Sequence, residues 1–338
     1  MELQYAENFA VDYYEDGYKM LTTLPDSKRY LLVPEGQPVP RGLDEDVSIL
    51  QEPLQNIYLV ASGAMDMFAS LDAVDQIRFS GQKQENWYIQ TAKDAMAAGN
   101  MIYAGKYSKP DYELLVSEGC DLAIENRMIT HSPEVVEMLQ SFDIPVMIEY
   151  SSYEQHPLGK VEWVKFFGAL TGKEAEAEEA FAEQTEILEK VESGEKTGKT
   201  IAFFYVTSNG LIQVRQSTDY IPKLIELAGG RYIFEDLEDS GSGRSTLNMQ
   251  VEDFYAGAKD ADILIYNSSI DGGVTTVDEL IGKCNILKDF KALQEGQVYC
   301  TTNDMYQQSM AIGYLLQDMH TVLTDDDTAK LRYLFLLQ

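Results

Sequence analysis

One uninterrupted helical stretch, Lys173 to Val191, most constrains the fold of this chain. The stretch is rich in Ala, Glu, Lys and Leu and contains neither glycine nor proline. Its apolar residues recur every three or four positions, which is the spacing of an amphipathic helix. Such a helix would be about 30 Å long, roughly the width of a small domain. The sequence on both sides has the pattern of an α/β domain, so we expect two lobes joined by one rigid helix.

Short apolar segments alternate with predicted helices on both sides of this stretch. The strands that we expect lie at 57–61, 77–80, 101–104, 121–125, 145–149, 201–206, 212–215, 263–266 and 297–301. This alternation is typical of βαβ units. The predicted fold class is therefore α/β, with two Rossmann-like lobes that contain mostly parallel sheets. The expected boundaries are 57–172 for lobe 1, 173–193 for the linking helix and 194–338 for lobe 2.

Residues 1–56 have a different character. Two aromatic and β-branched segments, 8–13 and 18–23, flank Glu15-Asp16-Gly17, which is a hairpin turn signal. Another short strand at 30–33 precedes a proline-rich loop. We expect a small N-terminal β-hairpin extension packed on lobe 1.

Composition excludes several functional classes. The net charge of −30 over 338 residues argues against binding to nucleic-acid backbones. The three cysteines lie far apart, so neither a zinc site nor a disulfide framework is indicated. No run of apolar residues is long enough to span a membrane. The chain opens without a hydrophobic signal segment, so we expect either a cytosolic protein or a mature chain whose export signal has been removed.

The two predicted lobes share an internal repeat. Glu113 lies in the first turn of a predicted helix, and Glu252 lies in the first turn of another. Each helix leads into a strand that opens with an aspartate followed by aliphatic residues, Asp121 in one lobe and Asp262 in the other. The pattern indicates one fold present twice.

With this repeat in place, the chain resembles the substrate-binding proteins of ABC importers for iron–siderophores, haem and cobalamin. The resemblance covers roughly residues 57–323 and rests on the segments LVASGAMDMFASLDAVDQI, YELLVSEGCDLAIENR, LQSFDIPVMIEY, GALTGKEAEAEEAF, YIPKLIELAGGRYIF and VEDFYAGAKDADILIYN. It implies a ligand held in a shallow cleft between the lobes and little hinge motion. It also implies residence outside the cytoplasm, in the periplasm or anchored by lipid to the outer face of the membrane, and delivery of the ligand to a permease.

The resemblance also implies a role for the two repeated glutamates. Glu113 and Glu252 match the positions at which this family presents one carboxylate per lobe to arginines of the permease. Two separated carboxylates on a rigid body form a charge-matched dock. The alternative is that each glutamate is simply favoured by the dipole of its helix.

Candidate ligand-binding residues are aromatic, methionine, arginine and asparagine side chains near the ends of the predicted strands, because ligands bind beyond the carboxyl ends of parallel strands. Aromatic and methionine side chains offer broad apolar surface, and arginine neutralises an anionic ligand. The candidates are Met65, Trp87, Tyr107, Arg127, Met128, Tyr150, Tyr153, Tyr205, Arg215, Arg244, Asn303, Met305 and Tyr306. For each of them, ordinary packing is the simpler alternative.

Direct metal binding and catalysis are not indicated. The three histidines lie in separate elements; His156 is conceivable as an axial haem ligand, although a solvated loop histidine is the simpler interpretation. We expect no cofactor, a ligand that carries iron or cobalt itself, and a monomer whose partners are this metal chelate and an ABC permease. The alternative is a two-lobed Rossmann-like enzyme of the chelatase or glycosyltransferase type. Glu125 and Glu149, at adjacent strand ends, keep this alternative open.

Overall fold

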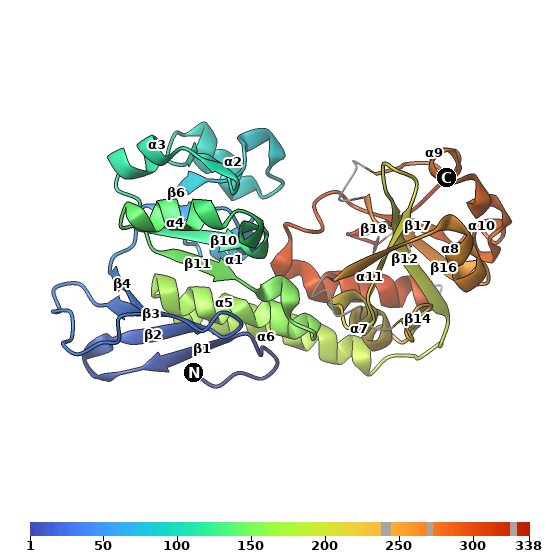
Figure 1. Cartoon of the computed structure of the whole chain (residues 1–338). Helices are drawn as coiled ribbons and strands as arrows, with labels where there is room; N and C mark the ends of the chain where they lie inside the picture. The colour runs from blue at the N-terminus through green and yellow to red at the C-terminus, as the bar shows by residue number, and fades with distance from the viewer. Residues whose placement is uncertain (238–244, 269–272, 325–329) are drawn as a thin grey trace. The chain divides into compact units, whose positions relative to one another are not determined.

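The computed structural model describes residues 1–237, 245–268, 273–324 and 330–338 (Figure 1). The chain forms two compact units. Unit 1 comprises Met1–Glu154, Leu158–Glu183 and Gln307–Met310, and unit 2 comprises Gln155–Pro157, Gln184–Tyr306 and Ala311–Gln338. The lobe boundaries expected from the sequence stay a prediction.

The central sheet of unit 1 is parallel, with strand order β11-β10-β5-β6-β7. Its strands are β5 (Ile57–Leu59), β6 (Ile77–Ser80), β7 (Ile102–Tyr103), β10 (Leu122–Asn126) and β11 (Val146–Glu149). The helices between them are α1 (Ala64–Ser70), α2 (Gln90–Ala97), α3 (Tyr112–Ser117) and α4 (Pro133–Ser141). Leu115 of α3 and Leu139 of α4 pack on the same apolar cluster as Tyr58 and Ala123 of the sheet. A two-stranded ribbon, β8 (Gly105–Lys106) with β9 (Lys109–Pro110), precedes α3.

The N-terminal section is a four-stranded sheet rather than a hairpin alone. Its strands, in the order β1-β2-β3-β4, are β1 (Phe9–Tyr13), β2 (Lys19–Thr23), β3 (Lys28–Val33) and β4 (Val47–Gln51). The turn between β1 and β2 contains Asp16 and Gly17, both in the left-handed region with φ of 59° and 85°. The expected hairpin is present, and β4, which pairs in parallel with β3, adds a strand that the sequence analysis did not predict.

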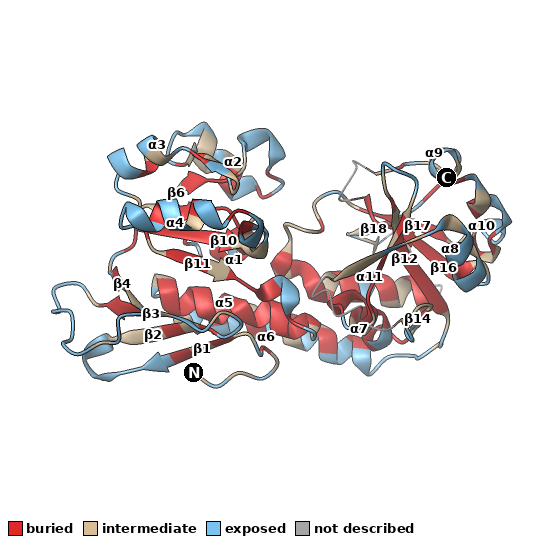
Figure 2. Ribbon diagram, in the orientation of Figure 1, coloured by how far each residue is buried: buried red, intermediate tan, exposed pale blue. Residues whose placement is uncertain are grey.

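A buried helix, α5 (Pro157–Thr171), lies against the N-terminal sheet, and Figure 2 shows it buried along almost its whole length. The ring of Phe9 lies 5.0 Å from Trp163 and 5.3 Å from Phe166. The next aromatic residue of the helix, Phe167, lies 5.1 Å from Phe68 of α1. A helix that is buried all round needs neighbours on every side, and the N-terminal sheet provides part of this cover.

Two buried carboxylates hold the N-terminal segment to this part of unit 1. Glu162 of α5 accepts hydrogen bonds from the backbone amides of residues 4–6, at 2.8 to 3.1 Å. Glu154 accepts from the amides of Glu7 and Asn8 at 2.9 and 3.0 Å, and from the Trp163 indole at 2.9 Å. Charge-assisted bonds of this kind are stronger than neutral ones, so the segment before β1 is firmly anchored.

The helix predicted at 173–191 is confirmed as α6 (Glu174–Glu192), which runs without interruption. It follows Gly172, whose φ of +71° ends α5, because only glycine adopts this conformation without strain. Residues of α6 up to Glu183 belong to unit 1, and those from Gln184 belong to unit 2. The stiffness attributed to this helix stays a prediction.

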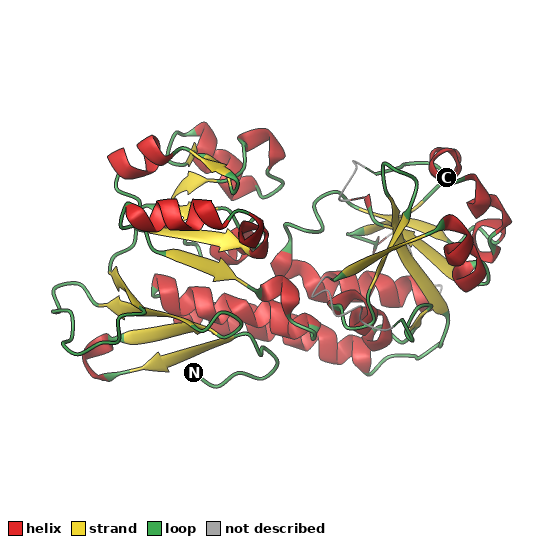
Figure 3. Ribbon diagram, viewed as in Figure 1, coloured by secondary structure: helices red, strands yellow, loops and turns green. Residues whose placement is uncertain are grey.

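The main sheet of unit 2 is mixed (Figure 3). Its strands are β12 (Thr200–Val206), β13 (Ile212–Arg215), β14 (Arg231–Tyr232), β15 (Thr246–Met249), β16 (Ile263–Tyr266), β17 (Val298–Thr301) and β18 (Leu334–Leu336). Strands β14, β12, β16 and β17 are parallel, whereas β13, β15 and β18 pair antiparallel with their neighbours. The accompanying helices are α7 (Tyr220–Leu227), α8 (Val251–Ala258), α9 (Val277–Lys283), α10 (Lys291–Gln294) and α11 (Ile312–Thr324).

The aspartate of the sequence repeat makes the same kind of backbone contact in both units. Asp121, before β10, accepts hydrogen bonds from the amides of Gln55 and Asn56 ahead of β5, at 3.0 and 2.9 Å. Asp262, before β16, accepts from the amide of Thr200 at the start of β12, at 2.7 Å. In each unit the aspartate therefore satisfies backbone donors where the neighbouring parallel strand begins. The α/β fold class is confirmed.

Candidate functional site

Four of the candidate residues gather at the carboxyl ends of β10 and β11 in unit 1. These strands are parallel neighbours, and Asn126 pairs with Glu149, so the segments that follow them leave from the same edge of the sheet. After β10, a short 3-10 helix, η4 (Arg127–His131), carries Arg127 and Met128. After β11, Tyr150 leads into the turn η5 (Ser151–Tyr153).

Arg127 and Tyr153 form a stacked pair, which we call the Arg127–Tyr153 platform. The guanidinium carbon lies 4.5 Å from the centre of the tyrosine ring, within the range of a cation–π contact. The Tyr153 side chain is 39% exposed and the neighbouring Met128 is 49% exposed. This edge of unit 1 thus exposes an aromatic and a thioether side chain beside a half-buried arginine.

Tyr150 differs from its neighbours because it is buried. Burial raises the pKa of its phenol, and the charge of Asp26, in the turn between β2 and β3, raises the pKa further. Tyr30 of β3 reaches the same region, where its hydroxyl donates to the carbonyl of Val146 at 2.8 Å. We therefore assign Tyr150 to the packing between β11 and the N-terminal sheet.

A second group, the Arg215 cluster, lies in unit 2 and consists of Arg215, Asp219, Asn267 and Tyr306. The Arg215 guanidinium forms an ion pair with Asp219 at 3.4 Å and donates to the Tyr306 hydroxyl. The Asn267 amide donates to the same hydroxyl at 2.9 Å. Asn267 follows β16 and Tyr306 follows β17, so both lie at the carboxyl edge of these strands.

Arg215 itself is committed to the interior of unit 2. Burial alone would lower the pKa of its guanidinium, but Tyr306 and Asp219 outweigh burial and raise the pKa. The expectation that Arg215 ends a parallel strand is wrong, because β13 runs antiparallel to β12. Its charge is already neutralised by Asp219, so Arg127 is the better candidate for neutralising an anionic ligand.

The remaining candidates divide by burial. Met65, Trp87 and Met305 are buried, and the Trp87 indole donates to the Ser80 hydroxyl at 3.1 Å. In this structure they have no surface to offer a ligand. The half-buried candidates are Tyr107, which packs on the core of unit 1, and Tyr205, which packs on the core of unit 2. Asn303 is exposed, and Arg244 lies outside the described residues.

Both glutamates of the sequence repeat are exposed. Glu113 lies in the first turn of α3, where Asp111 caps the helix by accepting from the Leu114 amide at 3.1 Å. Glu252 lies in the first turn of α8. Each helix leads into the corresponding strand of its unit, β10 or β16. Their position is compatible with docking, and their docking role stays a prediction.

The sequence analysis missed two asparagines that occupy matching positions. Asn126 ends β10 and accepts from the Met128 amide at 2.8 Å, which starts the turn that carries Arg127. Asn267 follows β16 and bonds to Tyr306. The signal was present, because Asn126 lies five residues after Asp121 and Asn267 lies five residues after Asp262.

Glu125 and Glu149 do not form an acid pair. Paired residues of neighbouring strands point to the same face of a sheet, and successive residues alternate between faces. Glu125 pairs with Ile148, and Glu149 pairs with Asn126, so the two carboxylates point to opposite faces. Glu149 is used locally, since it accepts from the Ser151 amide at 2.8 Å. The two glutamates therefore no longer support the alternative of an enzyme with a pair of catalytic carboxylates.

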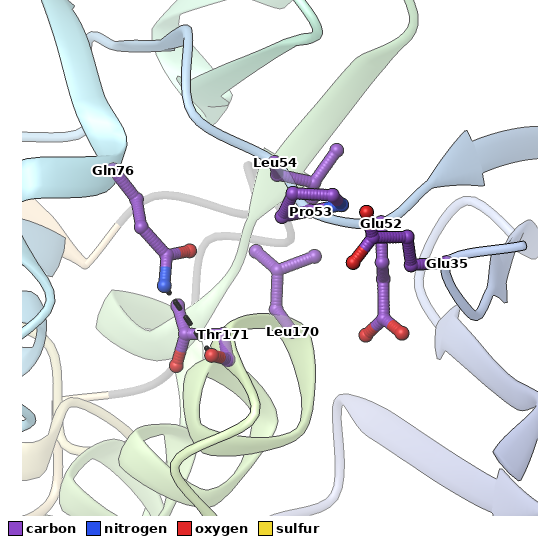
Figure 4. Close-up of a pocket in the computed structure, with 7 residues that line it drawn as sticks. All are labelled: Glu35, Glu52, Pro53, Leu54, Gln76, Leu170 and Thr171. Atoms are coloured by element: carbon purple, nitrogen blue, oxygen red, sulfur yellow. Dashed lines mark hydrogen bonds between the residues drawn. The ribbon is translucent and has the colours of Figure 1, made fainter.

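A pocket of about 260 Å³ in unit 1 lies elsewhere (Figure 4). It is lined by Glu35, Glu52, Pro53, Leu54, Gln76, Leu170 and Thr171. Leu54 precedes β5 and Gln76 directly precedes β6, so the pocket lies at the amino ends of these strands, opposite the Arg127–Tyr153 platform. The lining contains the carboxylates of Glu35 and Glu52 but no arginine or lysine, so the pocket would repel an anionic ligand.

Metal ligands are not grouped in the part of the chain that the structure describes. No set of three or more His, Cys, Asp or Glu side chains there is arranged to hold a metal ion. Burial lowers the pKa of His156. No described helix is both long and apolar enough to cross a membrane.

No protein-family model matches the chain. Two relatives are uncharacterized lipoproteins of Methanocaldococcus jannaschii. One is 24% identical, with 95% of this chain and 81% of the relative covered. The other is 25% identical, with 90% of this chain and 78% of the relative covered.

Several solved structures with a similar fold are named as periplasmic binding proteins. A possible iron-binding, periplasmic solute-binding protein of Staphylococcus epidermidis matches with a TM-score of 0.61 at 17% identity, covering 80% of this chain and 98% of that one. The periplasmic haem-binding protein HutB of Vibrio cholerae matches at 0.62 and 14%, covering 79% and 98%. The catecholate-siderophore binding protein VctP of Vibrio cholerae matches at 0.60 and 11%, covering 94% and 100%.

The chain therefore has the two-lobed α/β fold of periplasmic binding proteins. The resemblance to substrate-binding proteins of ABC importers is confirmed at the level of the fold. The expectation that the chain is not an enzyme agrees with the names of these structures, all of which are binding proteins.

Proposed function

We propose that this protein is an extracytoplasmic solute-binding receptor of an ABC importer. It captures a ferric siderophore, haem or corrinoid-like ligand and delivers it to a membrane permease. The observation that carries the proposal is the Arg127–Tyr153 platform, in which a half-buried arginine stacks on an exposed tyrosine at the carboxyl ends of β10 and β11. Ligands of open α/β sheets bind at this edge.

The chemistry of the platform suits a large, partly planar and anionic ligand. A tyrosine ring and an exposed methionine offer apolar surface at a low cost in conformational entropy. The Arg127 guanidinium adds a positive charge that is weakly hydrated and able to form forked hydrogen bonds. In a chain with a net charge of −30, an anion needs such a local cation in order to bind.

The relatives support the place of action that we propose. The two archaeal relatives are named lipoproteins, and the solved structures are periplasmic proteins named for iron, haem or a catecholate siderophore. We infer that this protein also works outside the cytoplasm, in the periplasm or anchored to the outer face of the membrane. Glu113 and Glu252 are the docking carboxylates for permease arginines, one on each unit.

A titration of arginine variants tests the proposal. Both tryptophans, Trp87 and Trp163, lie in unit 1, so their fluorescence reports ligand binding near the platform. Replacing Arg127 by methionine removes one charged hydrogen bond and should weaken an anionic ferric chelate by about 1.5–3 kcal/mol. Arg29→Met is the matched control, because Arg29 is a unit 1 arginine that pairs with Asp44 and Asp46 in the N-terminal sheet.

The two arginine variants separate a local role from a general one. We expect the Arg29→Met variant to bind like the wild type. An unchanged dissociation constant in Arg127→Met would remove the platform from the ligand site. An equal loss in both variants would indicate a nonspecific effect of net charge.

A further inference from the structure

A second arginine–tyrosine stack lies in unit 2, between Arg332 and Tyr314. The guanidinium carbon of Arg332 lies 3.9 Å from the centre of the Tyr314 ring. Arg332 is exposed, in contrast to the buried Arg215. Tyr314 belongs to α11, and Arg332 lies two residues before β18. The sequence analysis predicted neither residue as a ligand contact.

The register of β18 places this stack at the functional edge of the unit 2 sheet. Strand β18 runs antiparallel to β17, with Thr301 opposite Leu334. The amide of Thr302, just beyond β17, donates to the Tyr333 carbonyl at 2.9 Å. Arg332 therefore lies beyond the carboxyl end of β17, the edge at which Asn267 and Tyr306 are also found.

The backbone that carries Arg332 is held rigidly. Asp318 of α11 is buried, and its carboxylate accepts from the amides of Arg332, Tyr333 and Leu334 at 2.8, 2.6 and 3.1 Å. Three such bonds fix the approach to β18 before any ligand arrives. A preorganised contact loses less entropy on binding than a mobile one.

We propose that Arg332, stacked on Tyr314, is the cationic ligand contact of unit 2 and selects for anionic chelates. The inference rests on the proposed function. It gives unit 2 an exposed arginine, whereas Arg215 is buried and paired with Asp219. A neutral chelate gains nothing from this charge, so the contact is a determinant of specificity.

The test compares two small iron(III) probes, the trianionic tris-catecholate and the neutral tris(acetohydroxamate), with haem and cobalamin as further ligands. Dissociation constants are measured by calorimetry for the wild type, Arg332→Met, Arg332→Lys and Arg231→Met. Arg231 is the matched control, because it is an exposed unit 2 arginine paired with Glu235. It begins β14 and lies opposite Thr200, at the amino end of β12.

We expect Arg332→Met to weaken the tris-catecholate about tenfold and to leave the neutral complex within about twofold of the wild type. Arg332→Lys should retain part of the preference, and Arg231→Met should retain all of it. Far-ultraviolet circular dichroism checks that each variant keeps the secondary structure of the wild type.

Three outcomes overturn the inference in different ways. Unchanged tris-catecholate binding in Arg332→Met removes this residue from the site. An equal loss for both probes shows a structural role instead of charge selection. A wild-type protein that binds only the neutral probe refutes the charge selection. One that binds neither probe, nor haem, nor cobalamin refutes the proposed function itself.

Discussion

Glu125 makes the stability of unit 1 depend on pH. It lies in β10 with its side chain fully buried, and neither carboxylate oxygen has a hydrogen-bond partner among the described residues. Burying an unpaired charge is costly, so the neutral acid is favoured. Burial accordingly raises the pKa of Glu125 from 4.5 to about 8. We expect a protonated, uncharged Glu125 in the folded protein at neutral pH.

The magnitude follows from linkage between protonation and folding. Because the folded-state pKa is above the unfolded-state value, the contribution to stability is fully present below pH 4.5 and is lost as the pH rises towards 8. Each pH unit in this window costs about 1.4 kcal/mol. At pH 7 the accumulated loss is about 3 kcal/mol, and above pH 8 it approaches about 5 kcal/mol.

Urea unfolding of the wild type and Glu125→Gln from pH 5 to pH 9 measures this effect. Tryptophan fluorescence follows unit 1, because Trp87 and Trp163 both lie in it. The free-energy difference between the two proteins should change by about 1 kcal/mol or more per pH unit up to pH 8, in favour of the variant. Because both proteins contain all the other titratable groups, the contributions of those groups cancel in this difference. The exposed Glu113→Gln control should stay within about 0.5 kcal/mol of the wild type. A difference between Glu125→Gln and wild type that is the same at every pH would refute the reasoning.

Two further predictions concern docking and unit 2. Charge reversal at Glu113 and Glu252 together should abolish uptake by cells or vesicles that carry the permease, because the permease arginines would meet like charges. The affinity of the variant for its ligand should be unchanged. A loss of ligand affinity would contradict the docking role. Arg215→Met should lower the free energy of unfolding of unit 2 by about 3–5 kcal/mol, because it removes the charge that faces buried Asp219. Circular dichroism during urea unfolding measures this loss, and a change below about 1 kcal/mol would show that the ion pair is dispensable.

Features set by local sequence were predictable. The helix α6 was found within one residue at each end, because its periodicity and its lack of glycine and proline leave no competing structure. The repeated aspartates identified equivalent strands in the two units, because Asp121 and Asp262 both accept hydrogen bonds from backbone amides near the start of the neighbouring strand. The strand β4 (Val47–Gln51) was missed because it pairs in parallel with β3, and such a pairing leaves no local turn signal.

The site was only partly predictable, for a related reason. Arg127 and Tyr153 lie together because they follow the adjacent parallel strands β10 and β11. Their role as ligand contacts stays a prediction. Trp87 was predicted as a ligand contact but lies in the core, because the loop that carries it folds back so that the indole reaches Ser80. The antiparallel direction of β13, which carries Arg215, was not indicated by the sequence pattern.

The measurement that tests the central claim most directly is a calorimetric titration of the purified protein with a ferric catecholate, a ferric hydroxamate, haem and cobalamin. The account predicts that at least one of these binds with one molecule per chain and a dissociation constant of about 1 μM or tighter, equivalent to about −8 kcal/mol. It also predicts that this ligand quenches tryptophan fluorescence in unit 1. Binding of none of the four at concentrations of about 100 μM would contradict the assignment as a metal-chelate receptor.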